Sequence, residues 1–147
     1  MKANTKLVTQ PDVIEKYNAF PVDVKEKIFR LRDWLIDVSE SLEDVTRIEE
    51  SLKWGEPSYR SNIGSTIRFY WSEKRPEIIG MYCQCTSLLI PSIKNTFGNA
   101  FLYDGNRGVL LDKNGLWDEE KIKQIMIAAL RYHKVKHLLD LNLVSEL

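Results

Sequence analysis

The sequence predicts an α+β domain in which an antiparallel sheet of about five strands packs against helices on one face. Helical periodicity appears near both ends of the chain, and a period-two alternation runs through the middle. Strands grouped between helices favour such a layer, because each apolar face must be buried against another element. The 147 residues contain no repeat or linker, so we expect one domain over residues 1–147, opening with a polar N-terminal arm at residues 1–8.

Two helices are expected ahead of the strands. The first begins near residues 9–10, with Pro11 in its first turn, and ends at Phe20 because Pro21 disfavours a helical residue before it. The second should end around residues 39–41. Its apolar residues recur at spacings of four and three, which makes one buried stripe: Val24, Ile28, Leu31, Leu35 and Val38.

Alternation of apolar and polar residues predicts the strands. Arg68, Tyr70 and Tyr82 fall on the face opposite the apolar residues of their strands. Residues 55–58 (Gly-Glu-Pro-Ser) are typical of a turn. Asp-Gly at 104–105 indicates either a tight hairpin turn or a glycine bulge. The expected strands cover residues 47–54, 67–72, 79–85, 100–103 and 109–111.

A short helix is expected among the strands and a long one after them. The short helix covers residues 88–97, with Thr86 or Ser87 as its cap and Gly98 closing it. Asp118 caps the long helix, and the apolar stripe of that helix is Ile122, Ile125, Met126 and Ala129.

Composition excludes several classes of function without selecting one. The chain has 21 Lys+Arg and 21 Asp+Glu, so its net charge favours neither nucleic acid nor an anionic membrane, and we expect neither partner. No apolar run is long enough for a bilayer span or a secretory signal. The two cysteines, Cys83 and Cys85, would share one face of a strand about 6.6–6.8 Å apart, at the outer limit for a disulfide. Reduced thiols without an export signal indicate the cytoplasm.

Glu50 is the carboxylate whose predicted position is hardest to explain by exposure to solvent, because it falls on an apolar strand face. By strand alternation it shares a face with Ile48, Leu52 and Trp54, the apolar face that should meet the helices. A carboxylate there must pair, take a raised pKa or line an aqueous cavity, unless a bulge or strand edge turns it outward. Around the following Gly-Pro turn, Trp54 and Tyr59 form either the wall of a ligand site or a packed corner.

Charged and metal-ligating residues are also unevenly distributed. Acids dominate from Asp37 to Glu50, and carboxylates of this kind suit hard cations; the metal candidates are Glu43, Asp44 and Glu49. Residues 121–137 carry only basic charges, which favours an acidic protein partner. A solvated surface explains either cluster equally simply. Two histidines at 133 and 137 share a helix face and could join the cysteines at a metal, or all four could be structural.

These residues carry a resemblance to a known family. The most specific stretch is Glu50 followed by Lys-Trp-Gly at 53–55 and Pro-Ser-Tyr at 57–59; residues 81–86, 105–107 and 129–133 match further. Between Val13 and His137 the sequence resembles the YdhG-like family, whose function is largely uncharacterised. The resemblance implies a fold similar to frataxin, with helices against one face of an antiparallel sheet. It also implies an intracellular iron-chaperone role, which is proposed for some relatives.

Our leading hypothesis is a non-enzymatic module that binds a small molecule or a protein. Its site is a hollow around Glu50, Lys53, Trp54, Tyr59 and Arg107. Glu50 anchors a polar or cationic group, or pairs with Arg107 when the site is empty, and Trp54 and Tyr59 supply walls.

Three alternatives differ in class. A frataxin-like iron chaperone would use the carboxylates from Asp37 to Glu50. An enzyme would use Glu50 as general acid/base with His133 as its partner, although no nucleophile or cofactor motif accompanies them. A docking protein would use the basic C-terminal helix. Apart from iron no cofactor is expected, and the sequence leaves the oligomeric state open.

Overall fold

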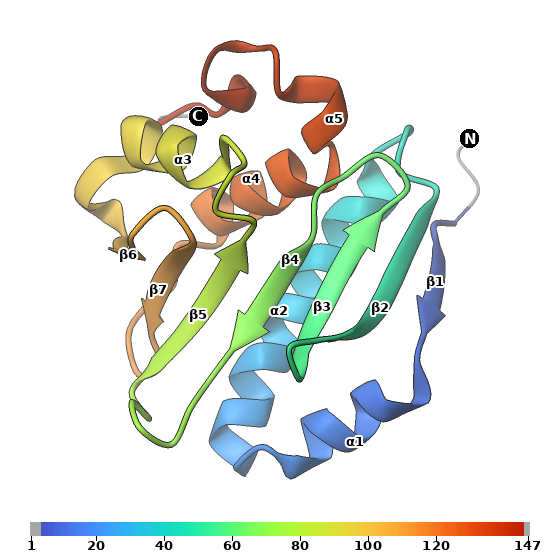
Figure 1. Cartoon of the computed structure of the whole chain (residues 1–147), viewed down its shortest axis with the longest axis vertical. Helices are drawn as coiled ribbons and strands as arrows, with labels where there is room; N and C mark the ends of the chain where they lie inside the picture. Colours follow the sequence, from blue (N-terminus) through green and yellow to red (C-terminus); the bar gives the residue numbers. More distant parts are fainter. Residues whose placement is uncertain (1–3, 146–147) are drawn as a thin grey trace.

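A seven-stranded mixed sheet forms the centre of the computed structural model, which describes residues 4–145 (Figure 1). The strands are β1 (Lys6–Thr9), β2 (Arg47–Lys53), β3 (Glu56–Ser61), β4 (Ile67–Tyr70), β5 (Ile78–Cys83), β6 (Leu102–Asp104) and β7 (Gly108–Asp112). Their order across the sheet is β1-β2-β3-β4-β5-β7-β6. Every neighbouring pair is antiparallel except β1 and β2, which are parallel.

The expected α+β class is confirmed, but the sheet has more strands than the expected five and is not purely antiparallel. Strand β1 lies within the segment expected to be a polar arm, residues 1–8. Strand β3 begins inside the segment expected to be a turn, residues 55–58, because the actual turn contains only Trp54 and Gly55. Pro57 fits in this inner strand because β4 pairs with β3 only at Ser58 and Tyr59.

The helices follow the predicted periodicity closely. They are α1 (Pro11–Ala19), α2 (Val22–Ser41), α3 (Leu89–Phe97), α4 (Glu119–Leu130) and α5 (Tyr132–Val135), with short 3-10 turns η1 (Gly98–Ala100) and η2 (Leu139–Asn142). Asp118 caps α4 as expected, because its Oδ1 accepts the Lys121 N–H at 3.1 Å. The short helix α3 begins one residue later than expected, after Leu88, but the expected cap Ser87 accepts the Leu89 N–H at its Oγ at 3.3 Å.

One face of the sheet packs against α2 and α4, which lie behind it in Figure 1, while no helix crosses the front face within residues 4–145. The packed face supplies fully buried residues from every long strand, and the predicted stripes of α2 and α4 are buried opposite them. Each such aliphatic side chain contributes about 1.5–3 kcal/mol when buried. The core side chains of the strands include Tyr59, Ile67, Phe69, Ile79, Met81 and Val109.

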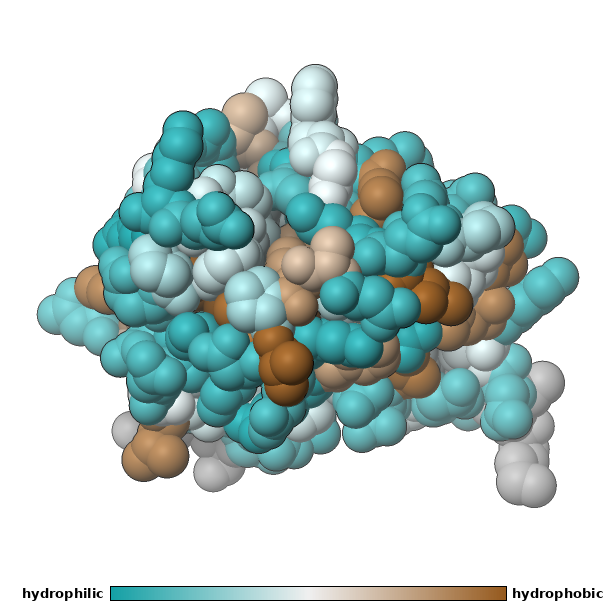
Figure 2. Space-filling view, turned by 90° about the horizontal axis from the view of Figure 1, so that it is seen from below, coloured by the Kyte–Doolittle hydropathy of each residue, from teal (hydrophilic) through white to brown (hydrophobic). Residues whose placement is uncertain are grey.

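The lower end of the molecule shows no dominant apolar area (Figure 2). Figure 2 views the lower end of the molecule, where small groups of hydrophobic residues are separated by hydrophilic ones. Scattered apolar residues of this kind are usual on protein surfaces. Within residues 4–145, no helix combines the length and the hydropathy needed to cross a bilayer.

The two cysteines occupy different environments, contrary to the shared face expected for them. Cys83 ends β5 in the core, and burial raises the pKa of its thiol to about 12, whereas Cys85 lies beyond the strand and is exposed.

At pH 8 we expect the thiol reagent DTNB to modify the exposed thiol of Cys85 rapidly and the buried thiol of Cys83 only after denaturation. The variant Cys85→Ser should lose the rapid phase, and rapid modification of both thiols in the native protein would contradict this burial.

Candidate functional site

Glu50 lies in the core between β2 and the helices, with only 1% of its surface exposed. Its carboxylate pairs with the Arg32 guanidinium through two hydrogen bonds, Nε to Oε2 at 2.5 Å and Nη2 to Oε1 at 3.1 Å. Oε2 also accepts from the Tyr59 hydroxyl at 2.6 Å, and Oε1 from the Thr9 hydroxyl at 2.9 Å. Each oxygen therefore has two donors, and the buried charge is fully compensated.

A second tyrosine extends this buried cluster. The hydroxyls of Tyr17 and Tyr59 are 2.6 Å apart. Tyr59 has one hydroxyl proton and donates it to Glu50, so Tyr17 must be the donor to Tyr59. Burial raises the pKa of both tyrosines, which keeps these protons in place. The cluster joins α1, α2, β1, β2 and β3 at one point.

Hydrogen bonding also keeps the Glu50–Arg32 pair ionised. Burial raises the pKa of Glu50, but the hydrogen bonds from Arg32, Tyr59 and Thr9 outweigh that effect, so the pKa lies below its usual value. The hydrogen bond to Glu50 raises the pKa of Arg32 in turn.

The expected pairing of Glu50 with Arg107 was therefore wrong, because Arg32 takes that place. The alternative of an outward-turned Glu50 was also wrong. His133, the partner expected by the enzyme hypothesis, lies in α5 and is not among the groups that bind Glu50. One signal for Arg32 was present in the sequence: it follows Leu31 directly on the flank of the buried stripe of α2.

The other expected ligand residues separate across the sheet. Tyr59 points into the core with Glu50, whereas Trp54 and Arg107 lie at a hollow of about 420 Å³ on the open face. Lys53 is exposed at the end of β2 and does not line this hollow. The residues that do are Trp54, Glu56, Arg68, Tyr70, Tyr82, Asp104 and Arg107, which we call the open-face site.

Trp54 stands at the rim of the open-face site, with 89% of its surface exposed. Trp54 and Gly55 form the two-residue turn between β2 and β3, and their φ angles are 55° and 76°. Such a turn requires a positive φ at both positions to match the twist of the strands. A bulky residue rarely adopts a positive φ, which usually costs about 1–3 kcal/mol. The backbone of Trp54 is therefore strained, and the surrounding fold holds it in this conformation.

Tyr82 forms the floor of the open-face site because two glycines make room for its ring. A Cβ at Gly80 or Gly108 would lie 2.4 or 2.9 Å from the ring, which therefore lies directly against the backbone. Its hydroxyl donates to Asp104 Oδ2 at 2.8 Å. Burial raises the pKa of Tyr82 to about 12, and the hydrogen bond to Asp104 makes the second-largest contribution to this increase. Tyr70 meets the same ring edge-on at 5.7 Å between centroids.

Two arginines supply positive charge there, each next to one acid. Arg68 lies over the Tyr82 ring at 5.9 Å, and its Nη1 donates to Glu56 Oε2 at 2.7 Å. Arg107 is 60% exposed in its side chain, and its Nη2 donates to Asp104 Oδ2 at 3.2 Å. The remaining side-chain nitrogens of both arginines make no hydrogen bond to another residue in the described part of the chain.

The alternation of the strands already placed Arg68, Tyr70 and Tyr82 on one face, but local pattern alone did not indicate that they form a site. Asp104 was assigned to a turn. The missing information was the strand order, which brings β4, β5, β7 and β6 side by side. Residues from strands far apart in sequence meet only once that order is known.

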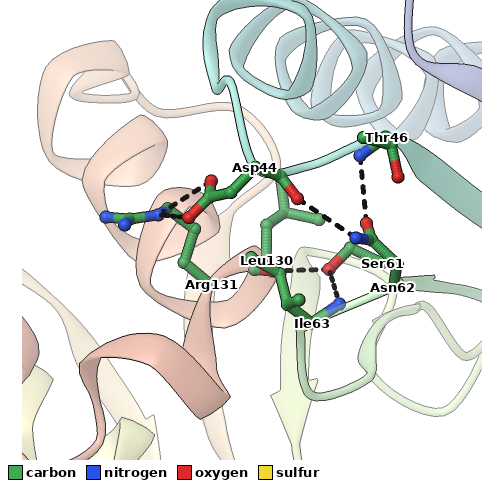
Figure 3. Close-up of polar contacts among 7 residues, drawn as sticks. All are labelled: Asp44, Thr46, Ser61, Asn62, Ile63, Leu130 and Arg131. Carbon is green, nitrogen blue, oxygen red and sulfur yellow. Dashed lines mark hydrogen bonds and ion pairs between the residues drawn. The ribbon is translucent and has the colours of Figure 1, made fainter.

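The predicted metal residues do not converge. Both oxygens of Asp44 accept from Arg131 Nε, at 3.1 and 2.9 Å, and Asn62 Nδ2 donates to the Asp44 backbone carbonyl at 3.1 Å (Figure 3). Glu49 pairs with Arg47 at 3.4 Å, and Glu43 is exposed. Among residues 4–145, no three His, Cys, Asp or Glu residues are grouped so that they could hold a metal ion. Iron binding by these acids stays a prediction.

The basic C-terminal segment is partly neutralised by acids from outside it. Lys121 pairs with Asp118 at 2.9 Å, and Lys123 pairs with Glu119 at 2.8 Å. Arg131, already bound to Asp44, separates α4 from α5, so the predicted basic helix is two helices. A docking role for this segment stays a prediction.

Comparison with protein-family models, with curated proteins and with solved structures yields no match to this chain in any of the three.

Proposed function

We propose that this chain is a non-enzymatic binding module that holds a small planar anion at the open-face site. The observation that carries the proposal is the combination of three aromatic side chains, of which Trp54 and Tyr70 are exposed, with two arginines in one hollow of about 420 Å³. Small-molecule sites are typically concave, with aromatic walls and a few placed polar groups. Guanidinium groups bind carboxylates and phosphates through paired hydrogen bonds, and aromatic faces stack on planar ligands.

The floor of this site is held in place before any ligand arrives. Tyr82 lies against two glycines, its hydroxyl donates to Asp104 and Arg68 lies over its ring, so little side-chain freedom is lost when a planar ligand packs beside them. Arg107 is exposed and has nitrogens to offer an anion.

The proposed ligand is a small molecule and not nucleic acid or a membrane. Glu56 and Asp104 accompany the two arginines, so the hollow attracts one anionic group more readily than a polyanion. The chain as a whole has no net charge.

The frataxin-like arrangement remains part of this proposal. The packing of α2 and α4 on the same face of a largely antiparallel sheet supports it. So does the part that the motif residues play in the fold: Glu50 and Tyr59 belong to one buried cluster, and Trp54-Gly55 makes the hairpin turn.

A calorimetric titration tests the proposal with 2-naphthoate and its neutral analogue 2-naphthamide as probes. We expect naphthoate to bind more tightly than naphthamide, and Arg107→Gln to weaken naphthoate binding at least tenfold, because a hydrogen bond to a charged group contributes about 1.5–3 kcal/mol. Arg60→Gln is the matched control, since Arg60 is exposed on the same face of β3 as Glu56 but does not line the hollow. Equal weakening by both variants, or equal affinity for both probes, would show that no specific anion site exists.

A further inference from the structure

A second hollow, of about 390 Å³, lies on the helical side of the molecule between α2, α4 and the C-terminal segment. It takes no part in the open-face site. Its apolar lining is entirely aliphatic: Val38, Ile127, Ala128, Val135, Leu141 and Leu143. Since no aromatic side chain lines it, the hollow offers contact to a flexible hydrocarbon chain and no stacking surface for a ring.

The C-terminal segment closes this hollow in an unusual conformation. Asp140, Leu141 and Asn142 have successive φ angles of 48°, 54° and 64°. Three consecutive non-glycine residues in the left-handed region are strongly disfavoured, and such strain persists only where surrounding contacts hold it. Leu141 and Leu143 from this segment contribute side chains to the lining.

Side chains on two helices hold the segment against the hollow. Gln124 on α4 makes a reciprocal pair of hydrogen bonds with the Val144 backbone, donating from Nε2 and accepting at Oε1, both at 3.0 Å. Asn95 on α3 donates from Nδ2 to the Asp140 carboxylate at 2.9 Å. Hydrogen bonds at Asp140 and at Val144 therefore hold the strained turn on both sides of Leu141, whose side chain is buried.

Arg131 supplies a cation at one end of the hollow. It lines the hollow, and its Nε is engaged by Asp44. Figure 3 shows its two terminal nitrogens pointing away from Asp44. They make no hydrogen bond to any residue between positions 4 and 145. A guanidinium edge with two free nitrogens suits a carboxylate, which it can bind through parallel hydrogen bonds.

The other charged residues favour one orientation of such a ligand. Lys123 is engaged by Glu119 at 2.8 Å, so it competes less for an anion. Glu120 lies eleven positions before Arg131, about 16 Å along the helix axis at 1.5 Å per residue. A carboxylate is therefore drawn to the Arg131 end and repelled from the Glu120 end.

We propose that this hollow binds an unbranched aliphatic monocarboxylate, with the carboxylate on the free edge of Arg131 and the hydrocarbon chain among the aliphatic residues. The proposal is independent of the open-face site, because the two hollows share no lining residue.

The test uses decanoate and 1-decanol as probes, with affinity measured by calorimetry and location by amide chemical shifts. We expect decanoate to bind at least tenfold more tightly than decanol, and Arg131→Gln to remove that preference. Asp44→Asn is the matched control: it breaks the same ion pair but leaves the arginine, so decanoate should bind it as tightly as the native protein or more tightly. Shifts should centre on Val38, Ile127 and Leu141.

Several outcomes would overturn the proposal. If Arg131→Gln and Asp44→Asn weaken decanoate equally, the arginine acts only through the stability of the α4 end. Equal affinity for decanoate and decanol would instead indicate a site for an apolar side chain of another protein. Shifts centred on Tyr82, or no binding up to the solubility limit of decanoate, would also exclude this site.

Discussion

Replacing Glu50 with alanine should lower the free energy of unfolding by about 3–5 kcal/mol, because it leaves the Arg32 guanidinium without its carboxylate and the buried Tyr59 hydroxyl without its acceptor. Urea unfolding at pH 7, followed by circular dichroism, measures this loss. Glu49→Gln is the matched control on the same strand, since Glu49 is exposed and its ion pair with Arg47 lies at the surface. Surface pairs contribute about 0–1 kcal/mol. A loss of only about 0–1 kcal/mol for Glu50→Ala would contradict a structural role for the buried cluster around Glu50.

The same residue should govern part of the acid sensitivity. The pKa of Glu50 is lower in the folded state than in the unfolded chain, where it is about 4.3, so protons bind preferentially to the unfolded state in acid. The contribution of Glu50 to stability is therefore complete above the unfolded pKa and is lost as the pH falls through the folded pKa. Glu50→Gln should show a shallower fall in the free energy of unfolding below about pH 4, whereas Glu49→Gln should keep the native slope.

A double substitution separates the ion pair from the rest of the cluster. Glu50→Leu alone leaves a partly buried cation, so adding Arg32→Met should recover part of the lost stability. The two changes should therefore be non-additive, as expected for residues in direct contact. Strict additivity would mean that Arg32 and Glu50 do not depend on each other for stability.

Gly64→Ala should destabilise the protein by about 1–3 kcal/mol, the usual range for overpacking a rigid site. A Cβ at this position would lie 2.6 Å from the backbone carbonyl oxygens of both Ala129 and Leu130. Neither oxygen can retreat freely, because the Ser65 N–H donates to Ala129 O at 2.9 Å and the Ser61 hydroxyl donates to Leu130 O at 2.5 Å. The second of these bonds is drawn in Figure 3. The end of α4 would have to move away from the sheet.

Thermal unfolding of Gly64→Ala beside Gly115→Ala provides the comparison. At Gly115 the three atoms nearest to an added Cβ all belong to the Asp112 side chain, the closest at 3.1 Å. We expect Gly64→Ala to lower Tm by several degrees and Gly115→Ala to change it by much less. Similar shifts for the two variants would mean that the loop before β4 adapts to the added methyl group.

Local patterns predicted the helices well. The apolar stripe of α2 and the Asp118 cap of α4 depend on residues a few positions apart, whose geometry a helix sets by itself. Strands β1 and β3 were missed because local sequence does not specify them. The residues of β1 are mostly exposed and show no alternation; they become a strand only through parallel pairing with β2. Residues 55–58 (Gly-Glu-Pro-Ser) have turn composition, yet the turn contains only Trp54 and Gly55, and β3 begins at Glu56.

By itself the sequence determined that the protein is α+β and which helix faces are buried, and it singled out the carboxylate at position 50, which had to pair, take a raised pKa, line a cavity or turn outward. These conclusions follow from periodicity and desolvation, which act over a few residues. The tertiary structure alone decided that the partner is Arg32, and that Tyr82, Asp104 and Arg107 meet Trp54 at one hollow. Strand order and register set the distances between residues that are remote in the chain, and neither can be inferred from local pattern.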